Sequence, residues 1–162
     1  MAFGRWLFYC AKMRTFAVTM PDFTFKKAER LKSLKVIGAL FKDGQSFGVY
    51  PLRLFWSAQP MPEGGGAPVQ FTVSVAKKNF KSAVARNRIK RQVREAWRLN
   101  KHRLYRRIEG SPQQYACMVL YVAKEDMPTA QIDKAMQTLL HLFYKKNIAT
   151  ANNQTKGEAP LS

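Results

Sequence analysis

FTVSVAKKNFKSAVARNRIKRQVREAWR, residues 71–98, is the stretch that sets the fold class of this chain. Apolar and polar residues alternate from Val69 to Ala76, which predicts a half-buried strand. A short basic loop follows, and Ser82 is a suitable residue to cap a helix at its N-terminus. Apolar residues at helical spacing then predict a helix from Ala83 to about Leu99. A strand that passes through a basic loop into a long helix therefore forms the centre of the fold.

The expected helix separates apolar from basic side chains. At about 100° per residue, five apolar residues fall within an arc of roughly 120°. They are Ala85, Ile89, Val93, Ala96 and Trp97. The opposite arc holds Asn87, Arg88, Lys90, Arg91, Arg94 and Arg98, with Arg86 at the apolar border. Like charges four residues apart repel, so solvent-facing helices usually mix signs. A single acid, Glu95, among so many bases instead indicates a surface for phosphate groups.

The whole chain is strongly basic. It has 162 residues with 28 Lys+Arg against 10 Asp+Glu, a net charge of +18. Residues 77–107 hold 13 of the basic residues and one acid, hence +12, which is two thirds of the total. Arginine outnumbers lysine there, and its planar guanidinium suits bidentate phosphate contacts. The charge therefore predicts a polyanionic partner.

The remaining sequence places strands and helices around this centre. We expect one or two short helices between Phe25 and Lys42, a strand over Phe47–Ser57 with Pro51 at an edge or bulge, a loop over Gln59–Pro68, a short helical piece within Asn100–Gly110, a buried strand over Tyr115–Ala123, and a last helix from Pro128 to about Tyr144. The first two strands are expected to pair as an antiparallel hairpin with a long tip. The order α-β-β-α-β-α predicts an α+β fold, a two-layer sandwich of one sheet and helices.

We divide the chain into three segments. Residues 1–22 are expected to be a flexible extension, with a later start at Met13 or Met20, a cleaved signal peptide, or a short segment packed on the domain surface as alternatives. Residues 23–146 are expected to form one RNA-binding domain. Residues 147–162 are polar without periodicity, which predicts a disordered tail.

Several classes of protein and site are disfavoured. Two cysteines, Cys10 and Cys117, are too few for a disulfide framework and fit free thiols in a reducing compartment. No apolar run reaches 18 residues, so no membrane span or membrane partner is expected. Only Glu125 and Asp126 are adjacent acids, and His102 and His141 fall in different elements without a cysteine cluster. We therefore predict no catalytic residues and no metal site within this chain.

The type of nucleic acid follows from what precedes the basic helix. A helix-turn-helix that reads DNA needs a partner helix across a short turn, whereas a strand is expected here, so no DNA partner is predicted. A sheet with exposed aromatic and basic side chains suits folded or single-stranded RNA. The candidates for a stacking surface are Phe41, Phe47, Arg53 and Phe55, with burial in the core as the alternative for each aromatic.

Two stretches resemble the protein component of bacterial ribonuclease P. They are FTFKKAERLKS at residues 23–33 and the residues 71–98 quoted above, in which a strand ending in two lysines leads into K-x-A-x-x-R-N-R-x-K-R-x-x-R-E. The resemblance covers about Phe25–Phe143. It implies the fold of the second domain of a small-subunit ribosomal protein, with a left-handed β-α-β crossover. It also implies that the chain is a cytoplasmic subunit of an endoribonuclease holoenzyme. The catalytic RNA of this holoenzyme would remove the 5′ leader of precursor tRNA by hydrolysis, with Mg²⁺ bound mainly by the RNA.

The resemblance also implies two binding surfaces. The ribonuclease P RNA subunit would contact Arg86, Asn87, Arg88, Lys90, Arg91, Arg94 and Arg98. The leader would lie in a cleft lined by Ile37, Phe41 and Phe55, with Arg53 beside them and Lys77 and Lys78 at the rim. Ile37 replaces an aromatic residue that the family has at this position, and no role is assigned to the loop Gly64–Gly66. A ribosomal or ribosome-assembly protein on the same fold and a DNA-binding regulator remain as alternatives.

Overall fold

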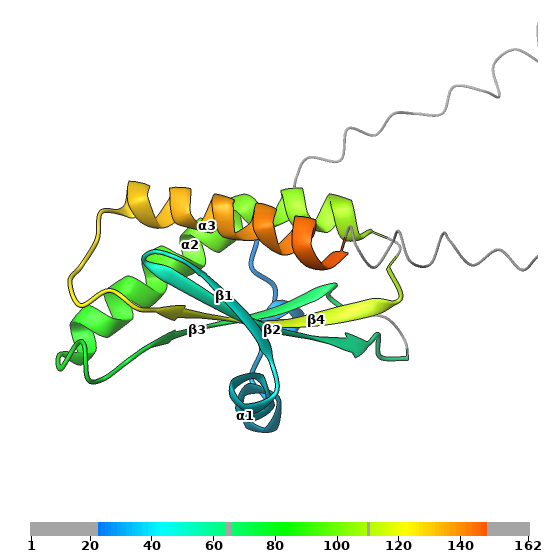
Figure 1. Cartoon of the computed structure of the whole chain (residues 1–162), viewed down its shortest axis with the longest axis horizontal. Helices are drawn as coiled ribbons and strands as arrows, with labels where there is room; N and C mark the ends of the chain where they lie inside the picture. Colours follow the sequence, from blue (N-terminus) through cyan, green and yellow to red (C-terminus); the bar gives the residue numbers. More distant parts are fainter. Residues whose placement is uncertain (1–22, 64–65, 110, 149–162) are drawn as a thin grey trace, which may run out of the picture.

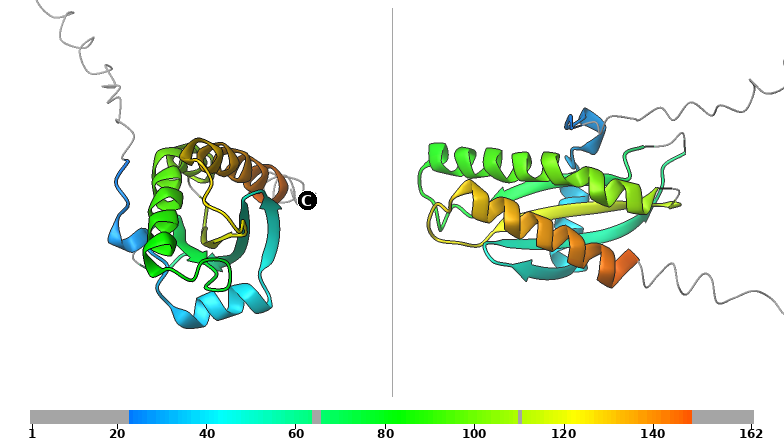
Figure 2. Two further views of the ribbon diagram at one scale, coloured as in Figure 1. Left: turned by 90° about the vertical axis from the view of Figure 1, so that its left-hand side faces the viewer. Right: turned by 90° about the horizontal axis from the view of Figure 1, so that it is seen from above.

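The computed structural model describes residues 23–63, 66–109 and 111–148, and the account below concerns these residues. The elements in chain order are η2 (Lys27–Glu29, a 3-10 turn), α1 (Leu34–Lys42), β1 (Gln45–Val49), β2 (Leu52–Pro60), β3 (Val69–Val75), α2 (Ala83–Ile108), β4 (Gln113–Tyr121), α3 (Thr129–Phe143) and η3 (Tyr144–Ile148, a π-helical turn). The four strands form one sheet, with α2 and α3 side by side on one face and α1 on the other (Figures 1 and 2). The predicted α+β class is confirmed.

The order of strands in the sheet is β1-β2-β4-β3. β2 pairs antiparallel with both β1 and β4, whereas β3 pairs in parallel with β4 after the crossover through α2. The predicted hairpin between the strands at 47–57 and 69–76 is therefore wrong, because β4 lies between them. The segment Phe47–Ser57 instead forms most of a tight hairpin of β1 and β2. Pro51 lies in its turn, where a missing N–H removes no ladder hydrogen bond.

α2 is one continuous helix of 26 residues rather than a helix followed by a separate piece. Its buried stripe extends past Trp97 through Asn100, Leu104 and Ile108 at helical spacing. The Asn100 amide donates to the Ala96 carbonyl at 2.8 Å and to Asp133 Oδ1 on α3 at 2.6 Å. A polar residue that looks like an interruption in the sequence thus joins the two helices.

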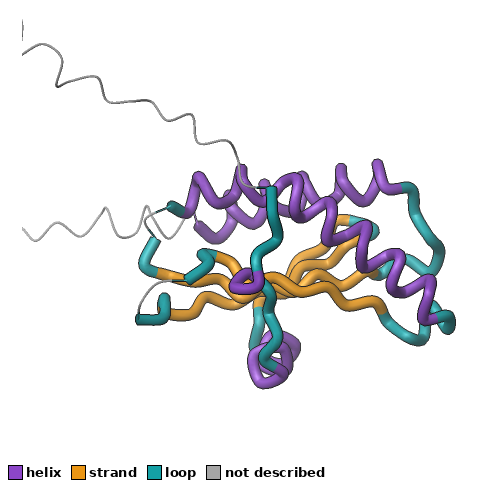
Figure 3. Tube along the Cα trace, turned by 180° about the vertical axis from the view of Figure 1, so that it is seen from behind, coloured by secondary structure: helices purple, strands orange, loops and turns teal. Residues whose placement is uncertain are grey.

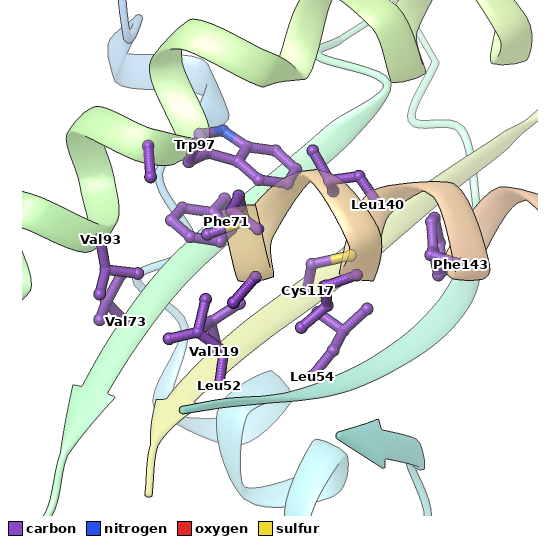
Figure 4. Close-up of a cluster of buried hydrophobic side chains, with 14 of the residues drawn as sticks. Leu52, Leu54, Phe71, Val73, Val93, Trp97, Cys117, Val119, Leu140 and Phe143 are labelled. Carbon is purple, nitrogen blue, oxygen red and sulfur yellow. The ribbon is translucent and has the colours of Figure 1, made fainter. Parts of the chain in front are cut away.

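The main core fills the space between the sheet and the two long helices. Phe71 of β3 stacks on Trp97 of α2 with ring centroids 4.1 Å apart and planes 5° apart. Leu54 and Val119 in the centre of the sheet and Phe143 of α3 are also buried (Figure 4). This packing fixes which side of α2 faces inward and so determines which side faces solvent.

A strap, residues 23–33, passes around the edge of the sheet from the layer of α2 to α1 (Figure 3). Arg30 bridges to Phe71, and the Leu31 N–H donates to the Phe71 carbonyl at 3.1 Å. The strap therefore covers part of the outer edge of β3, which would otherwise expose unpaired backbone groups. Leu31 then joins a second, smaller core with Leu40, Ala116 and Met118 under α1.

Candidate nucleic-acid interface

α2 presents the predicted basic surface. The Ser82 hydroxyl accepts from the Ala85 N–H at 3.4 Å and caps the helix, as predicted. The predicted inward side chains Ile89, Val93, Ala96 and Trp97 are buried, and Ala85 is half-buried. On the opposite arc Asn87, Arg88, Arg91 and Arg94 are exposed, and Lys90 and Arg98 are half-buried. The amphipathic pattern of the sequence thus places the cations outward.

Arg86 closes the loop in front of α2. Its Nη1 donates to the carbonyls of Phe80 and Lys81, at 2.8 Å each. These two bonds satisfy backbone oxygens that the turn leaves without helical partners. The resemblance implies an RNA contact for Arg86, whereas in the structure its guanidinium holds the loop that begins the helix.

Two other predicted contact residues already form ion pairs. Arg88 pairs with Asp126, which lies between β4 and α3. Arg98 contacts Glu95 at 2.5 and 2.8 Å and donates to the Phe23 carbonyl of the strap at 3.0 Å. Hydrogen bonding by Arg98 lowers the pKa of Glu95 below its ordinary value. Lys90, Arg91 and Arg94 form no ion pair within residues 23–63, 66–109 and 111–148, so their charges stay available to a partner.

The opposite face of the sheet carries an aromatic array beside α1. The rings of Phe41 and Phe55 lie 5.2 Å apart at 52°, and the Arg53 guanidinium lies 5.3 Å from the Phe55 ring. Arg53 also donates to the Ser46 hydroxyl at 3.0 Å, which holds the guanidinium over the sheet. Phe41 is 53% exposed. Ile37 is half-buried against the small core under α1, so it forms part of the wall beside the array.

Phe47 does not belong to this array. It pairs with Leu54 in the hairpin and packs against the main core on the helix side of the sheet. The prediction that it joins a stacking surface is wrong, because side chains alternate between the two faces of a strand. Phe47 and Phe55 lie on different strands and opposite faces.

The lysines after β3 lie at the end of the same face as Arg53. Lys78 lines a hollow of about 410 Å³ with Asn79, Leu120 and Lys124, and Leu120 pairs across the sheet with Arg53. The Asn79 amide donates to the carbonyls of Val122 and Ala123 at 3.3 and 3.2 Å, which fixes the loop against the end of β4. Lys77 is exposed beside it. The sequence analysis does not identify Lys124, whose only signal is its place three residues after the end of a buried strand.

The described part of the chain holds no candidate metal centre and no candidate membrane span. No group of three or more His, Cys, Asp or Glu in residues 23–63, 66–109 and 111–148 lies close enough to hold a metal ion. In the same ranges no helix is long and apolar enough to cross a bilayer. α2 and α3 are separated by β4, so these two helices do not form the short helix-turn-helix of DNA-binding regulators.

A family model described as Ribonuclease P matches residues 25–144. The chain belongs to this family. The ribonuclease P protein component of Porphyromonas gingivalis is 41% identical over 121 residues, which cover 74% of this chain and 86% of that protein. The ribonuclease P protein component of Chlorobium phaeobacteroides is 38% identical over 92 residues, 56% of this chain and 63% of that protein.

Solved structures of ribonuclease P proteins share the fold. The protein from Staphylococcus aureus superposes with a TM-score of 0.52 at 25% identity, covering 72% of this chain and 95% of that one. The protein from Thermotoga maritima gives a TM-score of 0.52 at 22% identity, covering 69% and 94%. The resemblance inferred from residues 23–33 and 71–98 is thereby confirmed. The handedness of the crossover and the role of each site residue stay predictions.

Proposed function

We propose that this chain is the protein subunit of ribonuclease P and assists a catalytic RNA in removing the 5′ leader from precursor tRNA in the cytoplasm. The observation that carries the proposal is the outer face of α2, where Lys90, Arg91 and Arg94 of the ribonuclease P motif have no ion-pair partner among the described residues. The chain holds the RNA subunit with this face and the leader on the other side of the sheet. The RNA performs the cut.

The contact of α2 with the RNA subunit is electrostatic. Arg91 and Arg94 lie three residues apart on an exposed face and repel each other in the free protein. A phosphate backbone relieves this repulsion, and each neutralised phosphate releases counterions. Arg88 joins the contact by exchanging Asp126 for a phosphate. An RNA helix carries phosphates on both sides of its grooves. A row of arginines is better suited to contact these phosphates than to read base edges.

The leader lies as a single strand along the face that carries Phe41 and Phe55. Single strands are held by aromatic side chains that stack on bases together with a basic groove that follows the backbone. The array of Arg53, Phe55 and Phe41 supplies the first feature, and Lys77, Lys78 and Lys124 at the end of the sheet supply the second. Stacking is sequence-tolerant, which suits precursors whose leaders differ.

Mg²⁺ is held by the RNA in this proposal. Mg²⁺ takes oxygen ligands in octahedral geometry, and the described surface of this chain faces the RNA with cations rather than clustered carboxylates. The two acids that lie at the α2 contact surface are already paired, Glu95 with Arg98 and Asp126 with Arg88. The chain instead lowers the repulsion between the RNA subunit and the substrate. That lowers the Mg²⁺ concentration at which the two polyanions can be brought together.

Reconstitution tests the proposal. The purified full-length chain, the ribonuclease P RNA and a precursor tRNA with a radiolabelled 5′ end are combined across a Mg²⁺ titration. We expect no cleavage by the chain alone, and cleavage by the RNA at a lower Mg²⁺ concentration when the chain is present. Equal cleavage with and without the chain at every Mg²⁺ concentration would contradict the proposal.

A further inference from the structure

A small basic cavity lies between α2 and α3, on the opposite side of the sheet from the leader surface. Its volume is about 100 Å³, and its walls include Arg103 and Arg107 of α2, His141 of α3 and Tyr144 of η3. This volume exceeds that of a single water site several-fold and is large enough for one tetrahedral oxyanion. The cavity is separate from every residue assigned above to the RNA subunit or the leader.

Among the described residues, the cations of the cavity have no acidic partner. Arg103 and Arg107 are four residues apart on α2, where like charges repel. Neither forms an ion pair within the described ranges, whereas Arg88, Arg98 and Lys101 all do. The nearest acid on α3, Asp133, does not compensate them. Its two oxygens accept hydrogen bonds from Asn100 and Gln137, at 2.6 and 2.8 Å.

The cavity is also held in shape. The Arg107 guanidinium lies 4.8 Å from the Tyr144 ring, and this cation–π contact keeps the charge at the cavity wall. Tyr144 begins the π-helical turn η3, and such turns are frequent at functional sites. The buried side chains of Leu104 and Leu140 contribute apolar wall, and the His141 ring offers an N–H donor in either protonation state. Two planar cations and one ring donor around a partly apolar wall are the kinds of groups that bind oxyanions in proteins.

From this arrangement we infer that the cavity binds one backbone phosphate of RNA and forms a second RNA contact, distinct from the motif surface. Arg107 lies 16 residues after Arg91, which is about 24 Å along α2 and about 160° around it. The two arginines therefore face different sides of α2, and RNA that lies flat on the motif surface does not contact the cavity. The occupant is therefore a second RNA element, either another part of the RNA subunit or the body of the precursor tRNA. The identity of the RNA partner rests on the proposed function, whereas the binding of a phosphate group in the cavity does not.

Matched charge variants test the inference. One variant carries Arg103→Gln and Arg107→Gln, and its control carries Arg106→Gln and Lys145→Gln, which remove the same charge from exposed neighbours that do not line the cavity. A third variant, Arg103→Lys with Arg107→Lys, keeps the charge, and thermal unfolding confirms that each variant is folded. The first readout is the salt dependence of binding, measured for the RNA subunit with the chain alone and for precursor tRNA with the holoenzyme.

We expect the cavity variant to lose about 0.7–0.9 in log–log salt slope in one of the two assays, the value of one phosphate contact. The assay that changes identifies which RNA supplies the phosphate. At low salt the affinity in that assay should fall roughly tenfold, as for the loss of one charge-assisted contact. The control should lose clearly less, and the lysine variant should recover most of the affinity. Equal losses in the cavity variant and its control would overturn the inference.

A second readout keeps this result independent of the proposed function. Inorganic phosphate is titrated into the chain while the arginine side-chain N–H signals are followed by NMR. Saturable shifts at Arg103 and Arg107, absent at Arg106, support the cavity even if the chain fails to bind the ribonuclease P RNA. Shifts that are equal at all arginines and never saturate would overturn the inference about the cavity. If only the Arg91 and Arg94 variants lose RNA binding, the inference fails while the proposed function stands.

Discussion

The Lys101 ammonium on α2 lies 2.6 and 2.7 Å from the two carboxylate oxygens of Glu29 in the strap. Both side chains are buried, and Lys101 also donates to the Thr24 carbonyl. The pair fixes the start of the strap to the helix that carries the RNA motif. From there the chain passes the edge of β3 and continues into α1, which carries Phe41. A single ion pair thus links the motif helix to the wall of the leader surface.

Removing one partner of this pair should destabilise the fold more than removing both. Lys101→Met leaves the Glu29 carboxylate buried without a counter-charge, which typically costs about 3–5 kcal/mol. The double variant Glu29→Met with Lys101→Met removes both charges. Its free energy of unfolding should be closer to that of the wild type. Urea unfolding of both single variants and the double variant measures this. A double variant that loses the sum of the single losses would show that the two groups do not interact.

The same pair should affect binding of the leader without affecting binding of the tRNA body. Lys101→Met loosens the strap and hence α1, so the holoenzyme should bind precursor tRNA with a leader less tightly, while its affinity for a leaderless tRNA stays the same. Asp133→Ala serves as the control, because it breaks a half-buried polar contact between α2 and α3 that does not touch the strap. A loss of leader affinity equal in both variants would assign the effect to general instability.

Phe41→Ala should weaken leader binding by about 1–3 kcal/mol if a base stacks on this ring. The ring is 53% exposed, so its removal should cost the fold little. Leu34→Ala, on the same helix and 83% exposed, is the matched control. Fluorescence anisotropy of leader-bearing and leaderless substrates on the holoenzyme measures the difference. If both substrates respond identically to Phe41→Ala, the ring does not contact the leader.

Asp126→Asn should tighten RNA binding. It releases Arg88 from its ion pair, so the guanidinium no longer has to leave a carboxylate to meet a phosphate. Glu63→Gln removes the same charge from an exposed position after β2 and controls for net charge. At low salt the affinity of Asp126→Asn for the RNA subunit should exceed that of the control by about two- to fivefold, equivalent to roughly 0.5–1 kcal/mol. Equal affinities would mean that Arg88 is outside the contact.

Cys117 should be chemically inert in the folded chain. Burial in β4 raises the pKa of its thiol far above the ordinary value of 9.0, and only the thiolate is nucleophilic. Because the folded state retains a proton that the unfolded state releases, this group favours folding below that value and stability falls as the pH rises above it. Iodoacetamide should modify a Cys10→Ser variant only in denaturant. Rapid labelling of the native variant at pH 8 would contradict the buried position.

Much of this structure could be predicted because its signals are local. The period of residues 83–99 determines both the buried and the exposed side of α2, and a single Ser82 marks its start. The pairing of strands is not local. β4 lies between β2 and β3 in the sheet, although it begins about 40 residues after the end of β3. A continuous apolar strand such as β4 lacks an alternation of apolar and polar residues, so its sequence does not indicate which strands it pairs with.

The site shows the same division between local and long-range signals. Which residues of α2 point outward follows from the helical period alone, and the structure agrees. Which of these side chains already have a partner within the protein depends on residues far along the chain. Arg88 pairs with Asp126, and Arg98 donates to the Phe23 carbonyl. The ion pair of Glu29 with Lys101 spans 72 residues, and no pattern in either segment indicates it.

The most direct test of the account is the salt dependence of RNA-subunit binding in a variant with Arg91→Gln and Arg94→Gln. Lys134→Gln with Lys145→Gln removes the same charge from exposed positions on α3 and η3 and is the control. The account predicts that the log–log slope falls by about 1.4–1.8 in the arginine variant, the value of two phosphate contacts, and by clearly less in the control. An unchanged slope in the arginine variant would show that the outer face of α2 does not bind the RNA.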